Sequence, residues 1–262
     1  MENKKVALIT GASSGIGKEF AKLHAEQGGD LVIVARSEDK LNHLKDELES
    51  KSNVKVTVIS KDLGTENATQ EIYDQVKALD IEVNYLINNA GFGGVSKFHE
   101  RDIKDDLAMI NLNISALTAL THHFLQDFVK RDEGKILNVS STASLLPGPL
   151  QAVYYATKAY VSSFSNALAE ELHDTNITVT NLMPGATETD FGKISGMDKT
   201  ELFKNTASAK TVARDGYNAM IKGKLDLISG LSTSQKIMMS MVPLTPKKVL
   251  LSQIRKMQEV KD

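Results

Sequence analysis

Several residue types are missing or scarce in this chain of 262 residues, and each absence removes a class of function. The chain has no cysteine, which excludes disulfides, thiolate metal sites and a cysteine nucleophile. Basic residues are not in excess, because 31 Lys and Arg stand against 33 Asp and Glu, and we expect no nucleic-acid partner. Six histidines are scattered without metal-ligand spacing, so we expect no metal site.

Long apolar runs are absent as well. No stretch approaches the roughly 18 apolar residues that a membrane-spanning helix needs. The first apolar run, Val6–Ile9, is too short for the core of an export signal. We therefore expect a cytoplasmic protein without membrane association. The methionine-rich stretch Ile237–Leu244 stays open between a substrate lid, a core or subunit contact, and a helix on a membrane surface.

What the chain does contain is a regular alternation of short β-branched runs and longer helical patterns. The strand candidates are Val6–Ile9, Leu31–Ala35, Val54–Ile59, Tyr85–Asn88, Ile136–Ser140, Ile177–Leu182 and Leu225–Ile228. The helix candidates are Gly15–Gln27, Glu38–Lys51, Glu66–Ala78, Asp102–Lys130 and Ala152–His173. This alternation predicts one α/β domain over residues 1–262, a doubly wound parallel sheet of Rossmann type with about seven strands and helices on both faces. We expect an irregular substrate loop or lid at about 190–210 and a C-terminal extension at about 231–262.

A glycine-rich turn joins the first predicted strand to the first predicted helix. It reads Thr10-Gly11-Ala12-Ser13-Ser14-Gly15-Ile16-Gly17. Glycine permits the unusual backbone angles of a tight turn, and the helix N-terminus offers free N–H groups to a pyrophosphate. Because the turn stands between strand one and helix one, it predicts dinucleotide binding by Gly11, Ser13, Ser14, Gly15, Ile16 and Gly17. The alternative is a glycine turn without a ligand.

The end of the second strand indicates which dinucleotide is bound. An acid at this point would bind the ribose 2′-hydroxyl of NAD and repel a 2′-phosphate. This chain has Arg36 and Ser37 there, and no acid before Glu38. A guanidinium and a hydroxyl can both bind a phosphate, so we predict NADP(H) in preference to NAD(H). The alternative is a solvated arginine at a strand end.

Tyr154 and Lys158 are four residues apart in a helical pattern, which places both side chains on one face. A lysine ammonium close to a phenol favours the phenolate and should lower the tyrosine pKa from about 10 toward the neutral range. Ser141 stands at the end of the fifth predicted strand, where its hydroxyl could polarise a substrate carbonyl. The Tyr/Lys spacing alone would also suit an ordinary surface pair.

These motifs occur together, in order: Thr-Gly-X-X-X-Gly-X-Gly, Asn-Asn-Ala-Gly at residues 88–91, Ser141, Tyr-X-X-X-Lys and Pro184-Gly185. In this combination, over residues 5 to about 190, the chain resembles the short-chain dehydrogenase/reductase family in its single-domain form.

The resemblance implies a role for each matching residue. Tyr154 would be the general acid/base, Lys158 would lower its pKa and hold the nicotinamide ribose, and Ser141 would orient the substrate oxygen. Asn113, for which Asn111 is the competing position, would kink its helix and anchor a water chain. Further cofactor contacts would come from Asp62, Leu63, Asn89, Ala90, Gly91, Pro184, Gly185, Thr187 and Thr189.

The expected function is therefore an NADP(H)-dependent oxidoreductase acting on a ketone, aldehyde or the matching alcohol. A non-catalytic NADP(H)-binding regulatory module is the alternative. The expected substrate-pocket walls, Phe92–Val95, Leu145–Gln151 and Phe191–Phe203, are mostly apolar, which indicates a moderately hydrophobic small molecule. We expect a homo-oligomer, either a dimer or a tetramer.

Overall fold

A seven-stranded parallel sheet forms the centre of the molecule. This computed structural model describes residues 4–259, apart from the side chains of Leu202, Met238, Ser240 and Pro243. The sheet order is β3-β2-β1-β4-β5-β6-β9, with every neighbouring pair parallel. The strands are β1 (Val6–Thr10), β2 (Asp30–Ala35), β3 (Val56–Ser60), β4 (Val83–Asn88), β5 (Gly134–Val139), β6 (Ile177–Pro184) and β9 (Asp226–Ser229). The strand order reverses between β1 and β4, and such a point opens a ligand crevice at the carboxyl ends of the strands.

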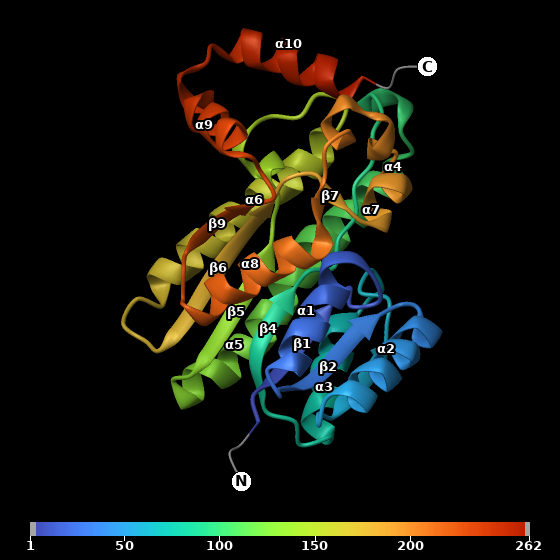
Figure 1. Cartoon of the computed structure of the whole chain (residues 1–262), viewed down its shortest axis with the longest axis vertical. Helices are drawn as coiled ribbons and strands as arrows, with labels where there is room; N and C mark the ends of the chain where they lie inside the picture. The colour runs from blue at the N-terminus through green and yellow to red at the C-terminus, as the bar shows by residue number, and fades with distance from the viewer. Residues whose placement is uncertain (1–3, 260–262) are drawn as a thin grey trace.

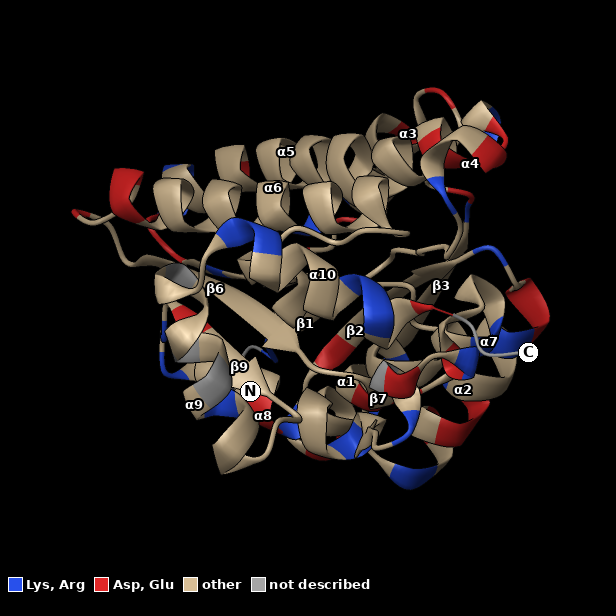
Figure 2. Ribbon diagram, turned by 90° about the horizontal axis from the view of Figure 1, so that it is seen from above, with Lys and Arg blue, Asp and Glu red and all other residues tan. Residues whose placement is uncertain are grey.

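Helices cover both faces of the sheet, as Figures 1 and 2 show. One face carries α1 (Gly15–Glu26), α2 (Glu38–Lys51) and α8 (Ala209–Ile221); the other carries α3 (Ala68–Ala78), α5 (Leu117–Arg131) and α6 (Ala152–Glu171). The predicted doubly wound α/β fold is confirmed.

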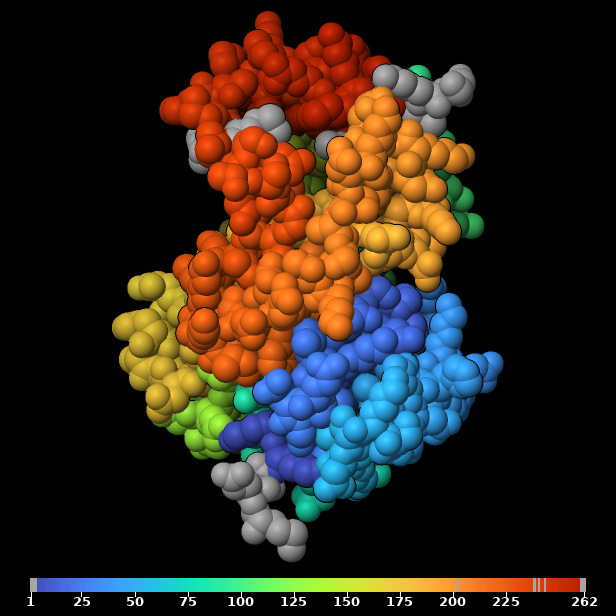
Figure 3. All heavy atoms as spheres, viewed as in Figure 1, coloured from blue at the N-terminus to red at the C-terminus, as the bar shows by residue number. Residues whose placement is uncertain are grey.

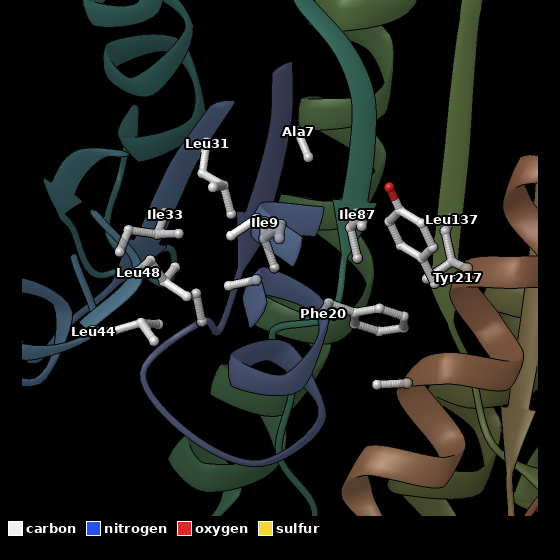
Figure 4. Packing of buried hydrophobic residues seen from close by; sticks show 14 of the residues in the cluster. Ala7, Ile9, Phe20, Leu31, Ile33, Leu44, Leu48, Ile87, Leu137 and Tyr217 are labelled. Atoms are coloured by element: carbon white, nitrogen blue, oxygen red, sulfur yellow. The ribbon is translucent and has the colours of Figure 1, made fainter. Parts of the chain in front are cut away.

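Each face has its own apolar core. On the first face Ile9 and Ile33 of the sheet pack with Phe20 of α1 and Leu44 of α2, all nearly excluded from solvent (Figure 4). Successive strand residues point to opposite faces, so Leu8 belongs to the second core, beside α3, α5 and α6. Because both faces are covered, the strands are apolar almost throughout rather than alternating.

The long helix predicted at Asp102–Lys130 has an interruption. It starts as α4 (Ile103–Ile110), where the Asp102 carboxylate caps the N–H of Lys104 at 2.9 Å, and ends as α5. Between them Asn111–Ala116 forms a π-helical turn. A π turn inserts one extra residue into the helix, so the side chains that follow point in a different direction around the helix axis. Such turns are frequent at functional sites.

The last third of the chain is more regular than the sequence analysis expected. The segment at 190–210 contains α7 (Asp190–Ser195) and a short strand pair, β7 (Thr187–Glu188) and β8 (Ala207–Ser208). After β9, α9 (Thr233–Met241) and α10 (Lys247–Gln258) lie at one end of the molecule (Figures 1 and 3). Short 3-10 turns complete the description at Phe98–Glu100, Thr142–Leu145, Met197–Lys199, Glu201–Phe203 and Val242–Leu244.

Candidate active site

One large cavity, of about 1010 Å³, opens where the strands end. The turn after β1, the ends of β2 to β6 and the start of α6 all contribute to its lining. The sequence-predicted residues in the lining are Gly11, Ser13, Ser14, Gly15, Ile16, Arg36, Ser37, Asp62, Leu63, Asn89, Ala90, Gly91, Ser141, Tyr154, Lys158, Pro184, Gly185, Thr187 and Thr189. Gly17 and Asn113 lie behind the cavity surface. Segments far apart in sequence are thus brought to a single site.

The glycine turn leaves room and hydrogen-bond donors for an anion. Gly11 and Gly15 have φ angles of +66° and +55°, which other residues rarely adopt. A Cβ on Gly17 would overlap the Gly11 carbonyl oxygen, so this glycine lets α1 pack against the turn. Ser14 precedes α1 but makes no side-chain cap, and the first turn holds no acid. The N–H groups and dipole of α1 are therefore directed toward the cavity, an arrangement that fits a pyrophosphate.

Thr10 was not singled out from the sequence, yet it fixes this turn. Its Oγ1 accepts hydrogen bonds from the N–H groups of Asn89 and Ala90, each at 3.0 Å. In return, Asn89 Nδ2 donates to the carbonyl oxygens of Thr10 at 3.0 Å and Gly11 at 3.3 Å. These bonds join the ends of β1 and β4 across the crevice. The signal in the sequence was a hydroxyl residue just before the first glycine.

The ends of β2 and β3 present positive charge at the rim. Arg36 is exposed, lines the cavity and, within residues 4–259, makes no ion pair through its guanidinium. Lys61, which the sequence analysis did not select, lines the same part and pairs with Glu71. Asp62 points Oδ1 back to the N–H of Gly64, at 2.9 Å, and so shapes the turn after β3.

The first turns of α6 carry Tyr154 and Lys158, which are 7 % and 6 % exposed. Lys158 Nζ donates to the carbonyl oxygen of Val139 at 2.9 Å, and the Ser140 hydroxyl donates to the Lys158 carbonyl at 2.8 Å. These bonds dock α6 on the end of β5. Ser141 follows at the strand end, where its Oγ accepts from the N–H of Ala143 at 3.1 Å.

The predicted lowering of the tyrosine pKa is wrong for this structure. Burial raises the pKa of Tyr154 to about 12, and hydrogen bonding to the Ser141 hydroxyl acts in the opposite direction without offsetting it. Burial also lowers the pKa of Lys158 to about 8. The lysine nitrogen lies 5.9 Å from the centre of the phenol ring. Desolvation dominates both shifts because both groups are buried.

Asn113 lies in the π turn, 1 % exposed, and braces the backbone behind the cavity. Its Nδ2 donates to the Phe92 carbonyl at 2.9 Å and to Thr157 Oγ1 at 3.1 Å, while its Oδ1 accepts from the Phe92 N–H at 3.1 Å. The competing Asn111 instead donates to the Gly64 carbonyl at 2.8 Å. Asn113 therefore connects the loop after β4 with α6.

The segment after β6 closes one side of the cavity. Gly185 donates its N–H to the Ser229 carbonyl of β9 at 2.9 Å, and Thr187 Oγ1 donates to the Gly185 carbonyl at 2.9 Å. Thr189 caps α7 through the N–H of Phe191, at 3.3 Å. The two threonines thus hold α7 at the cavity rim.

Apolar residues line the part of the cavity beyond Tyr154. Of the predicted walls, the residues in the lining are Phe92, Leu146, Gln151, Phe191, Ile194, Met197, Glu201 and Phe203. Residues of α9 and α10 complete the lining. Met239 and Met241 belong to the methionine-rich stretch Ile237–Leu244, for which a substrate lid was one of the open interpretations, whereas no residue of α10 was expected at the site. The Phe191 ring lies 5.6 Å from the Tyr154 ring, centre to centre.

Among residues 4–259 no three His, Asp or Glu side chains come together as metal ligands would. No helix in that range combines the length and the apolar character needed to cross a bilayer.

Comparison with known proteins places this site in context. Residues 5–199 match the family described as short chain dehydrogenase. The mouse very-long-chain 3-oxoacyl-CoA reductase is 35% identical over 194 residues, which are 72% of this chain but 61% of that protein's length. Sulfoacetaldehyde reductase 2 of Chromohalobacter salexigens is 35% identical over 188 residues, covering 71% of this chain and 74% of that protein.

Solved structures resemble the chain over nearly its whole length. A short-chain dehydrogenase from Sphingobium yanoikuyae in complex with NADPH has a TM-score of 0.82 and 29% identity, with 97% of this chain and 98% of that one covered. A bulky-bulky ketone specific alcohol dehydrogenase from Comamonas testosteroni has a TM-score of 0.79 and 27% identity, with 92% and 93% covered.

Proposed function

The chain belongs to the short-chain dehydrogenase/reductase family, and we propose that it is an NADP(H)-dependent oxidoreductase that interconverts a ketone or aldehyde with its alcohol. One observation carries the proposal. A single cavity is lined both by the glycine turn with the strand ends and by Ser141, Tyr154 and Lys158. The residues proposed for the dinucleotide and for the proton donor therefore share one cavity.

The residues present suit a dinucleotide with a 2′-phosphate. The uncapped start of α1 fits the pyrophosphate, and Arg36 with Ser37 stands where the phosphate of the adenosine ribose would lie. Lys61 lies at the same rim, where its ammonium pairs with Glu71. Asn89, Ala90, Gly91 and the segment from Pro184 to Thr189 would hold the rest of the dinucleotide. When bound, the nicotinamide supplies the hydride.

The protein would supply the proton and the orientation. Burial keeps the Tyr154 phenol protonated at neutral pH, as a general acid for carbonyl reduction requires. Ser141 would hold the substrate oxygen beside that hydroxyl, and Lys158 would hold the nicotinamide ribose. Asn113 would act as a positioning residue through its bonds to Phe92 and Thr157.

The experiment that tests this proposal compares two tyrosines of the same helix. Tyr154→Phe should lower kcat for NADPH-dependent carbonyl reduction by roughly 100- to 10,000-fold, because the proton donor is lost. The Kd for NADPH, measured by calorimetry, should change little. Tyr160→Phe is the control, since Tyr160 is exposed and its hydroxyl bonds Thr118 at 3.0 Å, away from the cavity.

The alternative, a non-catalytic NADP(H)-binding module, predicts a different result. Such a module would bind NADPH and reduce no compound of a broad ketone and aldehyde panel. Turnover that survives Tyr154→Phe would also contradict the proposed role. Cytoplasmic location, homo-oligomeric assembly and a substrate lid at 190–210 remain predictions from the sequence.

A further inference from the structure

The far wall of the cavity is built by the C-terminal helices together with α7 and the turn after it. Six of its residues define what we call the apolar wall: Met197, Met239, Met241, Leu250, Ile254 and Met257. Four are methionines, whose flexible thioether chains fit apolar bodies of varied shape. These six side chains offer dispersion contacts, and the polar residues that the C-terminal region adds to the lining, Gln235, Thr245 and Gln253, are all uncharged.

The apolar wall is attached to the helix that carries the proposed acid. Gln258 at the end of α10 is 0 % exposed, and its Nε2 donates to the Tyr155 hydroxyl at 2.6 Å. Ile254, one turn earlier, is 2 % exposed. Tyr155 follows Tyr154 directly, with ring centres 6.0 Å apart. Docking of α10 thus sets the distance between the apolar wall and the reacting end of the cavity.

Charge is distributed unevenly over the lining. Its three cations, among the described residues, are Arg36, Lys61 and Lys158, and all belong to the strand ends or α6. From residue 190 onward the charged residues described in the lining are Asp190 and Glu201. A substrate anion at the apolar wall would lose hydration without gaining a cation from the described lining, and Glu201, the next charged residue of that lining after Asp190, already pairs with Lys204.

We infer that the substrate is an uncharged carbonyl compound whose apolar body, several carbons long, lies against the apolar wall. This inference rests on the proposed function. It adds the substrate's charge and shape to the reaction class. A carboxylate, sulfonate or phosphate at the far end of the substrate is disfavoured by the same surface.

A matched set of three ketones tests the inference with NADPH as the reductant. 2-Octanone has four more methylenes than 2-butanone, and 7-oxooctanoate is 2-octanone with its terminal methyl replaced by a carboxylate. We expect kcat/KM for 2-octanone to exceed that for each of the others by roughly tenfold or more, because each buried methylene favours binding. Equal values for 2-octanone and 2-butanone, or a preference for 7-oxooctanoate, would overturn the inference.

A positive charge introduced into the apolar wall should shift the substrate preference toward the anionic ketone. Met257→Lys should raise the ratio of kcat/KM for 7-oxooctanoate over 2-octanone by roughly tenfold, because an ammonium then faces the substrate carboxylate. Ser252→Lys is the matched control, since Ser252 is exposed on α10 and outside the lining. The same change of ratio in both variants would show a general charge effect and contradict the inference.

Binding without turnover separates the two proposals. With NADP⁺ present, calorimetry should show tighter binding of 2-octanol than of 7-hydroxyoctanoate. If the three ketones and a wider panel show no turnover, the proposed function fails. If ketones are reduced but neither chain length nor charge matters, only the substrate inference fails.

Discussion

At the scale of single residues, burial rather than charge dominates the proposed acid. Tyr154 and Lys158 are both almost inaccessible, and burial raises the pKa of Tyr154 to about 12 and lowers that of Lys158 to about 8, so at neutral pH the phenol is protonated and the lysine is still mostly an ammonium. A protonated phenol suits reduction, where the tyrosine gives a proton away.

Arg36 gives a prediction about cofactor choice. Arg36→Ala should raise the Kd for NADPH by roughly 10- to 100-fold, since a charge-assisted hydrogen bond contributes about 1.5–3 kcal/mol. The Kd for NADH should stay nearly constant, because NADH has no 2′-phosphate. Calorimetry with both dinucleotides measures the two values. An equal loss for both would show that Arg36 supports the turn and not the phosphate.

The sequence alone predicted some residues of the site and missed others. Ser141, Tyr154 and Lys158 could be placed in one cavity because their spacing matches strand ends and helix turns. The pKa shift could not be predicted, since it depends on how completely α6 is buried. Thr10 was noted only as the first residue of the glycine motif, and its role was missed because the motif does not reveal the two N–H contacts by which its hydroxyl braces the turn.

At the scale of elements, α10 lies at the end of the described chain and packs against the helix that carries Tyr154. Its docking depends on Ile254 and on the buried Gln258 amide. The amide's Oε1 has no hydrogen-bond partner. A buried polar group of this kind makes the docking sensitive to a single substitution.

Gln258→Leu tests that docking. Loss of the bond leaves the Tyr155 hydroxyl unpaired, which should weaken α10 docking by about 1 kcal/mol or more. Amide hydrogen exchange should quicken in α10 and stay unchanged in β1 and β4. The KM for 2-octanone should rise while the Kd for NADPH is constant. Ser252→Ala serves as control, and uniform exchange in all elements would contradict the predicted local effect.

The main strands and helices before residue 185 were predictable, whereas the π turn at Asn111–Ala116 and several later elements were not. The strand and helix candidates before that point correspond to observed elements because each has a clear apolar period. The helix α8 was missed, although Val212, Gly216 and Met220 recur on its buried face. Only tertiary contact decides that α9 and α10 fold back over the cavity. The π turn depends on one extra residue, which periodicity does not reveal.

At the scale of the whole molecule, a buried histidine joins α1 and α8, on one face of the sheet, to the residue before β1. His24 on α1 is 2 % exposed, and its Nε2 lies 3.0 Å from the Lys5 carbonyl oxygen. A carbonyl can only accept, so Nε2 carries the hydrogen, and Nδ1 accepts from the Tyr217 hydroxyl of α8 at 2.8 Å. A Cβ on Gly29 would overlap this ring, which explains the glycine.

This arrangement predicts a pH-dependent stability. Burial lowers the pKa of His24 below its usual 6.5, so the folded state holds the ring neutral. The contribution is complete above pH 6.5 and is lost as pH falls from there toward the lower, folded-state pKa, because the unfolded chain binds the proton first. Urea unfolding at pH 7.5 and 5.5 should show a smaller pH difference for His24→Gln than for wild type.

The control uses an exposed histidine. His99→Gln should keep the wild-type pH difference, since His99 lies at the surface. Burial and the neighbouring His122 also lower the pKa of His123, so His123 contributes to the pH dependence of the wild-type protein. Only the difference between the variants and wild type therefore reports on His24. An identical pH difference in wild type and His24→Gln would refute the assignment.

The apolar wall has one more consequence, which concerns oxidants. In a chain with no cysteine, the reactive sulfur at the cavity belongs to thioethers, and Met241 is 53% exposed. Oxidation to the sulfoxide makes such a side chain polar, and methionine sulfoxide reductases reverse the change. Oxidation of these methionines would therefore weaken substrate binding at the apolar wall. The groups proposed to transfer the hydride and the proton would stay chemically unchanged.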